Sequence, residues 1–174
     1  MFGTDVFETE YYLPAGRWTE FIPNVSSAGP RVIDGPRWIK ETVPYDVIPS
    51  WVRPGSVLVL GPPGLGKPDY VLNDCPEVRL YELAEGDYTA AVPSGKGNEI
   101  AAVLNATRKG SQVTVKIASG SFVGDWKIRV YAHSLTVSAP QKATLAPSEA
   151  ADAGVGGTLL QADKGAKEVS FTLQ

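Results

Sequence analysis

Four segments in the C-terminal part of the chain alternate apolar and polar residues with a period of two. The alternation is clearest in SQVTVKI and EVSFTLQ, and it recurs in EVRLYEL and DWKIRVYA. Their apolar positions are Val78, Leu80, Val113, Val115, Ile117, Trp126, Ile128, Val130, Val169, Phe171 and Leu173. Such alternation is typical of strands in antiparallel sheets. It predicts strands that are packed on one face and exposed to water on the other.

The first 60 residues have shorter and less regular patterns. EYYLPAG predicts a short strand that ends in a Pro-x-Gly turn, and PRWIKETVP predicts a strand with a weakly marked apolar face. IPSWVRPGSVLVLG predicts two more short strands, separated by a turn at Pro54-Gly55. No segment of the chain has a convincing helical period, so the sequence favours an all-β fold.

Two further segments contain the turn residues that commonly join strands. ATRKGSQ at 106–112 has Gly110 at its bend and predicts a hairpin turn, and ADKGAKE at 162–168 predicts another. The stretch 139–157 is rich in Ala, Pro and Gly and predicts a long surface loop.

These elements fall into two groups on either side of a glycine–proline segment around 61–69. We therefore expect two small antiparallel β-sandwich modules in series, at residues 1–68 and 69–174.

Composition excludes several classes of protein. The chain has 174 residues, of which 43% are hydrophobic and 20% charged, so it can form a packed core. Its net charge is −3, with no evident basic patch, so a nucleic-acid partner is not expected. No apolar run approaches the ~20 residues of a membrane helix. The start MFGTDVFETE has neither the basic nor the apolar part of a secretory signal, which favours a cytoplasmic location over secretion.

The segment SVLVLGPPGLGKPDY resembles a phosphate-binding loop in its spacing alone. Gly61 and Gly66-Lys67 have the G-x-x-x-x-G-K spacing. A true loop continues with a Ser or Thr that holds Mg²⁺ and then a helix. Here Pro68 follows the lysine, and DYVLNDCP is too short and too strand-like for that helix. We interpret the segment as a linker and expect neither a bound nucleotide nor another cofactor.

No catalytic or metal-binding residue can be assigned from the sequence. Cys75 and His133 are the only residues of their kinds, which excludes an internal disulfide and a cysteine zinc cluster. A thiol–imidazole pair would require these two side chains to meet, and a buried or half-buried, inert Cys75 is the simpler expectation.

The 19 acidic residues form no obvious pair for glycoside cleavage, which needs carboxylates about 5–9 Å apart. Three of them are better explained as turn residues: Asp46, Asp69 and Asp74. Asn24 and Asn105 match the acceptor pattern for glycans, which matters only on a secretory route.

Aromatic residues are concentrated in the first region and suggest one alternative function. The aromatic residues in question are Tyr11, Tyr12, Trp18, Trp38 and Trp51. Exposed on one face, they would form a sugar-binding platform, and the protein would be a carbohydrate-binding module. Buried, they would fill a thin core, which is the more common role of Trp.

Two phrases resemble the segment that follows the catalytic barrel in glycoside hydrolase family 31. The first phrase is Tyr12-Leu13-Pro14, Gly16 and Trp18, and the second is Ile48-Pro49, Val52-Arg53, Ser56, Leu58 and Gly61. GPRW and the later KPDYV and VRLYEL are most similar to the α-xylosidase branch. The resemblance extends over nearly the whole chain, although it is faint beyond residue 132.

The resemblance implies that the chain contains most of a proximal and all of a distal C-terminal β-sandwich. The opening MFGTDVF departs from the family pattern, so the first module is expected to be incomplete. The family's two catalytic aspartates lie on a barrel whose motifs are not found here. The resemblance therefore implies a non-catalytic domain that supports the barrel of a retaining α-xylosidase-like enzyme. The barrel is the expected partner, and an oligosaccharide is a second candidate.

The same resemblance predicts apolar surface in the first region that would lie against the barrel. The candidate residues are Phe2, Val6, Phe7, Phe21 and Ile22. The sequence leaves open whether the chain is a piece of a longer gene product or a short protein in its own right.

Overall fold

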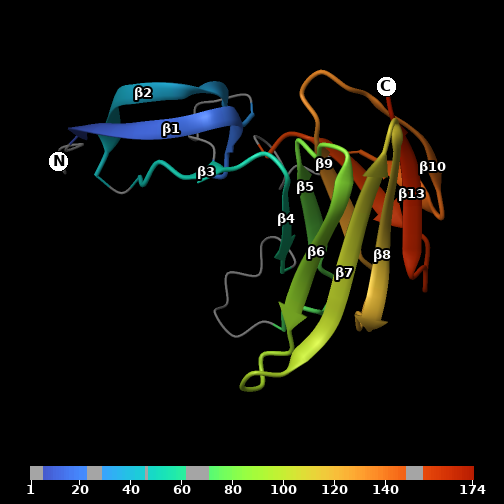
Figure 1. The fold of residues 1–174 in the computed structure, drawn as a ribbon. Helices are drawn as coiled ribbons and strands as arrows, with labels where there is room; N and C mark the ends of the chain where they lie inside the picture. Colours follow the sequence, from blue (N-terminus) through green and yellow to red (C-terminus); the bar gives the residue numbers. More distant parts are fainter. Residues whose placement is uncertain (1–5, 23–28, 46, 62–70, 148–154) are drawn as a thin grey trace. The chain divides into compact units, whose positions relative to one another are not determined.

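The computed structural model describes residues 6–22, 29–45, 47–61, 71–147 and 155–174. These residues form thirteen β-strands and no helix, so the all-β fold class is confirmed (Figure 1). Accordingly, the described residues contain no helix with the length and apolar character needed to cross a membrane.

The chain divides into two compact units, of which the first ends at Pro54 and the second begins at Gly55. A short piece around Gly156 belongs to the first unit. The division lies before the expected boundary at residue 69. The reason is that β4, Ser56–Leu60, pairs along its whole length with β5, Glu77–Tyr81, in the second unit.

The described residues of the first unit form a single three-stranded antiparallel sheet in the order β2-β1-β3. A sandwich has two sheets, so this unit agrees with the expectation of an incomplete module. Its strands are β1, Val6–Glu20, β2, Val32–Pro44, and β3, Trp51–Val52.

The predicted turn at Pro14-x-Gly16 is wrong, because β1 continues through it. The register with β2 shifts between Leu13 and Gly16, which makes this site a β-bulge. Gly16 has a φ of 128°. Its partner across the sheet is Gly35, where a Cβ atom would lie 2.0 Å from the carbonyl oxygen of Pro14. The two glycines therefore allow the long hairpin to bend without breaking.

The second unit is a β-sandwich of two five-stranded sheets. One sheet has the order β10-β13-β8-β7-β6, and the other has the order β11-β12-β9-β5-β4. All paired strands are antiparallel except β5 and β9. The remaining strands are β6, Gly86–Pro93, β7, Ile100–Lys109, β8, Gln112–Gly120, β9, Lys127–Tyr131, β10, Val137–Gln141, β11, Ala143–Ala146, β12, Thr158–Ala162, and β13, Glu168–Leu173.

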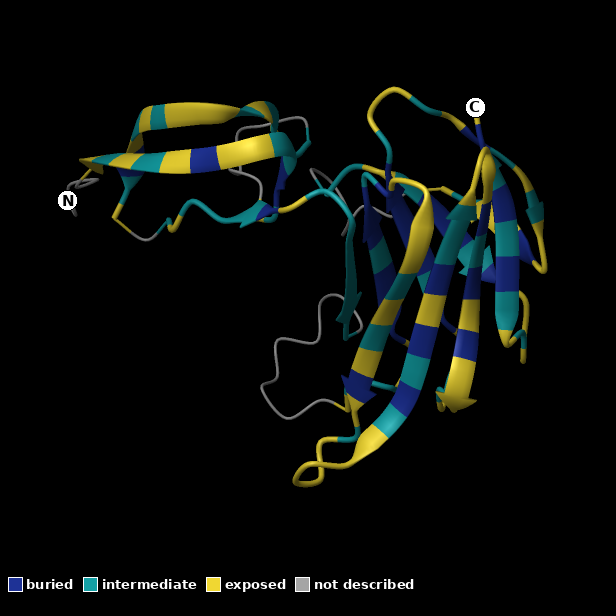
Figure 2. Cartoon of the chain, in the orientation of Figure 1, coloured by how far each residue is buried: buried dark blue, intermediate teal, exposed yellow. Residues whose placement is uncertain are grey.

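The apolar faces predicted from the period-two patterns form the core of this sandwich. Every one of the eleven predicted apolar positions is buried, including Val113, Ile128 and Phe171. Figure 2 shows buried and less buried residues alternating along β7 and β8. The hairpin turn at Gly110 is also confirmed, because β7 and β8 are paired antiparallel around it.

Two predictions for the C-terminal segments need correction. The turn at 162–168 joins β12 to β13, which lie in different sheets, so it is not a hairpin. The stretch 139–157 is not wholly a loop. It contains the end of β10 and all of β11, which are edge strands. Only Val137 in β10 and Ala143 in β11 are buried, so these strands have no alternating apolar pattern that the sequence could reveal. Residues 148–154 of that stretch lie outside the described residues.

Candidate functional site

A network of polar side chains connects the three strands of the first unit. The Tyr11 hydroxyl on β1 donates to Glu41 Oε1 on β2 at 2.6 Å, and Trp51 Nε1 on β3 donates to the Tyr11 hydroxyl at 2.8 Å. Arg31 pairs with Glu41 and also with Glu20, whose Oε1 lies 2.7 Å from Arg31 Nη2. The Arg31 guanidinium lies 5.1 Å from the centre of the Trp51 ring. Two carboxylates therefore share one guanidinium.

The electrostatics of this network oppose proton transfer. Hydrogen bonding to Arg31 lowers the pKa of the Glu41 carboxyl despite its partial burial. Burial and the hydrogen bond to Glu41 raise the pKa of Tyr11 to about 12. At neutral pH the carboxylate stays ionised and the phenol stays neutral, so neither group is matched to acid–base catalysis. Glycoside cleavage needs a carboxylic acid that is protonated at working pH, which Glu41 cannot supply. The network therefore has a structural role, and we call its five residues, Tyr11, Glu20, Arg31, Glu41 and Trp51, the brace.

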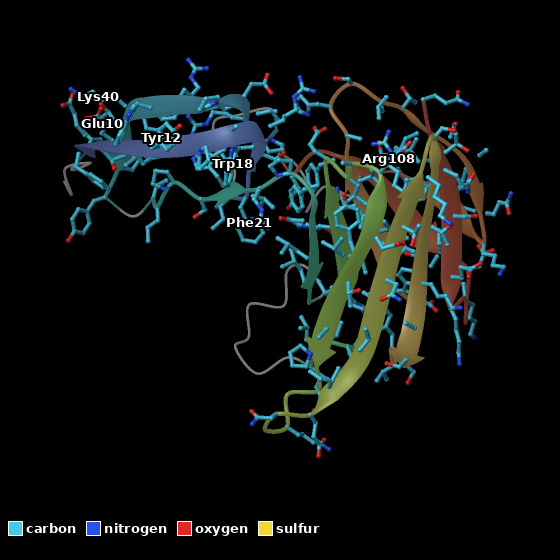
Figure 3. The ribbon with its side chains drawn as sticks, viewed as in Figure 1. Glu10, Tyr12, Trp18, Phe21, Lys40 and Arg108 are labelled. Atoms are coloured by element: carbon cyan, nitrogen blue, oxygen red, sulfur yellow. The ribbon has the colours of Figure 1, made fainter. Side chains whose placement is uncertain are left out.

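The structure separates the five aromatic residues of the predicted platform. Tyr11 and Trp51 belong to the brace and are half-buried. Trp18 is also half-buried, and its Nε1 donates to the carbonyl oxygen of Pro14 at 2.8 Å. Only Tyr12 and Trp38 are exposed, on neighbouring strands. Figure 3 labels Tyr12 and Trp18 on β1.

A second polar cluster lies on β5 and β9 of the second unit, on the face turned away from the core. Glu77 accepts hydrogen bonds from Arg79 Nε at 2.7 Å, and from Arg129 at 2.8 Å (Nε) and 3.1 Å (Nη2). Glu77 is 2% exposed and Arg129 0%. Beside them, the rings of Tyr81 and Tyr131 stack 4.5 Å apart with an angle of 7°. The prediction that this face of the strands meets water is therefore wrong.

The thiol–imidazole pair does not form. Cys75 lies just before β5 and His133 just after β9, and these strands are parallel and in register from Glu77 with Lys127 to Tyr81 with Tyr131. The two residues are therefore at opposite ends of the sheet, about 20 Å apart or more at ~3.3 Å per residue. Cys75 is exposed, contrary to the expectation of burial, and its pKa is raised by local desolvation and by Asp74. The raised pKa disfavours the thiolate, which is the nucleophilic form of cysteine.

Of the other residues singled out in the sequence, the structure describes Asp74 and Asn105. Asp74 lies in a turn, where its N–H donates to the Val71 carbonyl oxygen at 3.0 Å. Asp46, Asp69, Asn24 and residues 62–70 of the glycine-rich loop lie outside the described residues. Asn105 is exposed on β7 and accepts a hydrogen bond from Thr89 Oγ1 at 3.2 Å.

No group of three or more His, Cys, Asp or Glu residues is placed to hold a metal ion in the described parts of the chain. A cavity of about 10 Å³ lies at one end of the sandwich core. Its lining is apolar and includes Leu83, Tyr131 and Phe171. A volume of this size is about that of one water molecule, so the cavity cannot hold a sugar.

The described chain thus consists of one sheet that is held together by the brace and of a β-sandwich with a buried ion cluster on its outer face. The sequence model of the family described as "Alpha-xylosidase YicI, C-terminal domain" matches residues 72–173. The chain belongs to this family, and it is a C-terminal β-domain of the kind found in glycoside hydrolase family 31.

Solved structures of larger enzymes have the same fold over nearly the whole chain. The cycloalternan-forming enzyme from Listeria monocytogenes, in complex with a pentasaccharide substrate, is 19% identical with a TM-score of 0.62, and covers 95% of this chain. The Flavobacterium johnsoniae GH31 dextranase, complexed with glucose, is 13% identical with a TM-score of 0.61 over 96% of this chain. The ER glucosidase II complex is 11% identical with a TM-score of 0.56 over 96%. This chain covers 17%, 24% and 21% of those three chains.

Proposed function

We propose that this chain is a non-catalytic C-terminal region that supports the catalytic barrel of a family 31 glycoside hydrolase. In this proposal the first unit is the proximal domain, the second unit is the distal domain, and the parent enzyme is a retaining glycosidase of the α-xylosidase type. Family membership supports the proposal, as does the occurrence of the same fold within larger glycoside hydrolases.

The observation that carries the proposal is the open construction of the first unit. Within the described residues, β1 meets β3 only at Thr19 and Glu20, and the outer edge of β2 has no partner strand. Long unpaired strand edges normally pair with or are covered by another element. In the proposed role, the catalytic barrel would cover these strand edges.

Exposed apolar side chains are also concentrated in this unit. Its exposed large apolar residues are Val6, Phe7, Tyr12, Ile22, Trp38, Tyr45 and Ile48, whereas the much larger second unit has Val71, Ile100, Val123 and Leu145. Among the residues expected to lie against the barrel, Val6, Phe7 and Ile22 are exposed, Phe21 is half-buried and Phe2 lies outside the described residues. Exposed large apolar side chains are enriched where a partner is bound, so Val6, Phe7 and Ile22 are the candidates for contact with the barrel.

We expect the first unit to exchange its amide hydrogens faster than the second in the isolated chain. A single sheet with unpaired edges buries little apolar surface. Segments that bury little apolar surface open at a lower free energy, and their amides exchange faster. Hydrogen exchange should show protection in β1 and β2 that is at least about tenfold lower than in β8 and β13. Equal protection in both sets of strands would mean that the first unit is self-sufficient, which would contradict a supporting role.

We also expect the purified chain not to hydrolyse aryl α-xylosides or α-glucosides. Arg31 brings the carboxylates of Glu20 and Glu41 together in the first unit, but both are ion-paired with its guanidinium and the pKa of Glu41 is lowered, so the pair offers no protonated acid. Release of the aryl group should stay at the rate of the buffer blank. Turnover that is present in the wild type and absent in Glu41→Gln would show that the chain is itself an enzyme.

A further inference from the structure

One face of the β1–β2 hairpin presents an exposed aromatic pair. Tyr12 on β1 lies directly opposite Trp38 on β2, and their ring centres are 5.5 Å apart at an angle of 52°. The exposed fractions are 48% for Tyr12 and 66% for Trp38. Within the described part of the chain neither the Tyr12 hydroxyl nor the Trp38 Nε1 makes a hydrogen bond. Since Trp is usually highly buried, this exposure calls for an explanation.

Charged side chains continue the same face along the hairpin. Successive residues of a strand point to opposite faces, so Glu10 and Glu8 share the face of Tyr12. Lys40 lies opposite Glu10 in the register, and its Nζ is 3.2 Å from Glu8 Oε2. Figure 3 labels Glu10, Tyr12 and Lys40 on the hairpin. We call Glu8, Glu10, Tyr12, Trp38 and Lys40 the aromatic strip.

The opposite face of the hairpin has a different character. It carries Tyr11 and Glu41 of the brace, together with the buried side chains of Leu13 and Val43. The polar network and the buried apolar side chains of the hairpin therefore lie on that face, whereas the residues of the aromatic strip contact one another, through the Tyr12–Trp38 ring pair and the Glu8–Lys40 ion pair. The side chains of the aromatic strip are accessible to a ligand, and the chemistry of these side chains indicates which kind of ligand they fit.

We propose that the aromatic strip binds a neutral oligosaccharide. The C–H face of a pyranose ring stacks on an aromatic ring of similar size, and the two rings together offer a surface for one or two sugar units. The Glu10 carboxylate and the Lys40 ammonium lie beside the rings and can accept from and donate to sugar hydroxyls. The Trp38 Nε1 and the Tyr12 hydroxyl supply two more unused polar groups.

The charges of the strip disfavour the other classes of ligand. Two carboxylates and one ammonium repel a phosphate or a nucleic acid, which would need the opposite balance. A flat protein surface would have to remove water from Glu10 and from the exposed Glu8–Lys40 pair, whose burial is unfavourable without new partners. A sugar instead replaces the lost water with its own hydroxyls. The proposal is independent of the supporting role in an enzyme.

The test is an NMR titration of the full 174-residue chain with maltotriose, isomaltotriose and xylotriose. We expect a saturable shift of the Trp38 indole N–H signal with at least one of these probes, with a Kd of about 0.1–10 mM. Trp38→Ala should weaken the affinity at least about tenfold, while Trp38→Phe, which keeps a ring, should retain part of it. The matched control is Tyr45→Ala, which removes an 82% exposed aromatic residue outside the strip and should leave binding unchanged.

Several results would overturn the proposal. One is the absence of a saturable shift with all three probes at about 20 mM, which is twice the upper end of the expected range of Kd. Another is an equal loss of affinity in Trp38→Ala and Tyr45→Ala, which would indicate nonspecific contact. A third is a Trp38 signal that shifts with protein concentration and not with sugar, which would show that the strip binds a second copy of the chain. Both alanine variants remove exposed side chains, and their circular dichroism spectra should match that of the wild type.

Discussion

Replacement of Phe171 by alanine is expected to lower the free energy of unfolding of the second unit by about 3–5 kcal/mol. Phe171 lies on β13 and is completely buried in the core between the two sheets. Its neighbours in sequence and in the core, Val169 and Leu173, are also buried. The substitution removes a large apolar side chain and leaves a cavity that the surrounding strands can close only in part.

Urea denaturation provides the measurement, because the buried Trp126 of the same core reports on unfolding by fluorescence. The control is Val123→Ala, which shortens a 74% exposed side chain in the same unit. Surface changes of this kind alter stability by no more than about 0.5 kcal/mol. Similar small effects of both substitutions would mean that the two sheets are not closely packed around Phe171.

The strands of the second unit could be predicted from the sequence because their pattern is a direct consequence of the fold. A strand between a core and an outer face must alternate, and SQVTVKI alternates over its full length. Val113, Val115 and Ile117 are buried as predicted. The turn at Gly110 was equally predictable, since its φ of 58° favours glycine.

The long hairpin of the first unit could not be predicted in the same way. A Pro-x-Gly sequence commonly ends a strand, but here the chain continues because Gly35 on the neighbouring strand accommodates the bulge. That accommodation depends on a residue nineteen positions further along the chain, so no local pattern around Gly16 contains it. The sequence likewise could not determine that Trp38 is exposed and Trp51 half-buried, because both depend on contacts between strands.

The buried ion cluster shows a further limit of sequence patterns. In DWKIRVYA, Lys127 and Arg129 occupy the polar positions of an alternating strand, which predicts solvent exposure. In the structure Arg129 is buried, because Glu77 reaches it from β5. The two residues are far apart in sequence and meet only when β5 and β9 pair in parallel. Their contact is therefore a result of topology.

The replacement Glu77→Gln is expected to lower the free energy of unfolding by about 3–5 kcal/mol at pH 7, because it removes the buried carboxylate charge that the guanidinium groups of Arg79 and Arg129 share. Glu77 holds both Arg79 and Arg129, and all three side chains are buried or nearly so. The control is Glu168→Gln, which removes a half-exposed carboxylate 4.0 Å from Lys142. A surface pair of this kind contributes only about 0–1 kcal/mol.

The pH dependence of stability separates the charge of Glu77 from its packing. Burial alone would raise the pKa of the Glu77 carboxyl, but the hydrogen bond from Arg129 and the charges of both arginines outweigh burial and lower it below the ordinary value of 4.5. A lowered pKa in the folded state means that the contribution of Glu77 is complete above pH 4.5 and is lost as the pH falls through the folded pKa. Urea denaturation of the wild type and Glu77→Gln should therefore differ most near neutral pH, and the difference should shrink steadily below pH 4.5, where the wild-type carboxyl becomes neutral as well. A difference that stays constant down to the acid limit would show that the amide disturbs packing and that the ion pairs of Glu77 do not stabilise the sheet.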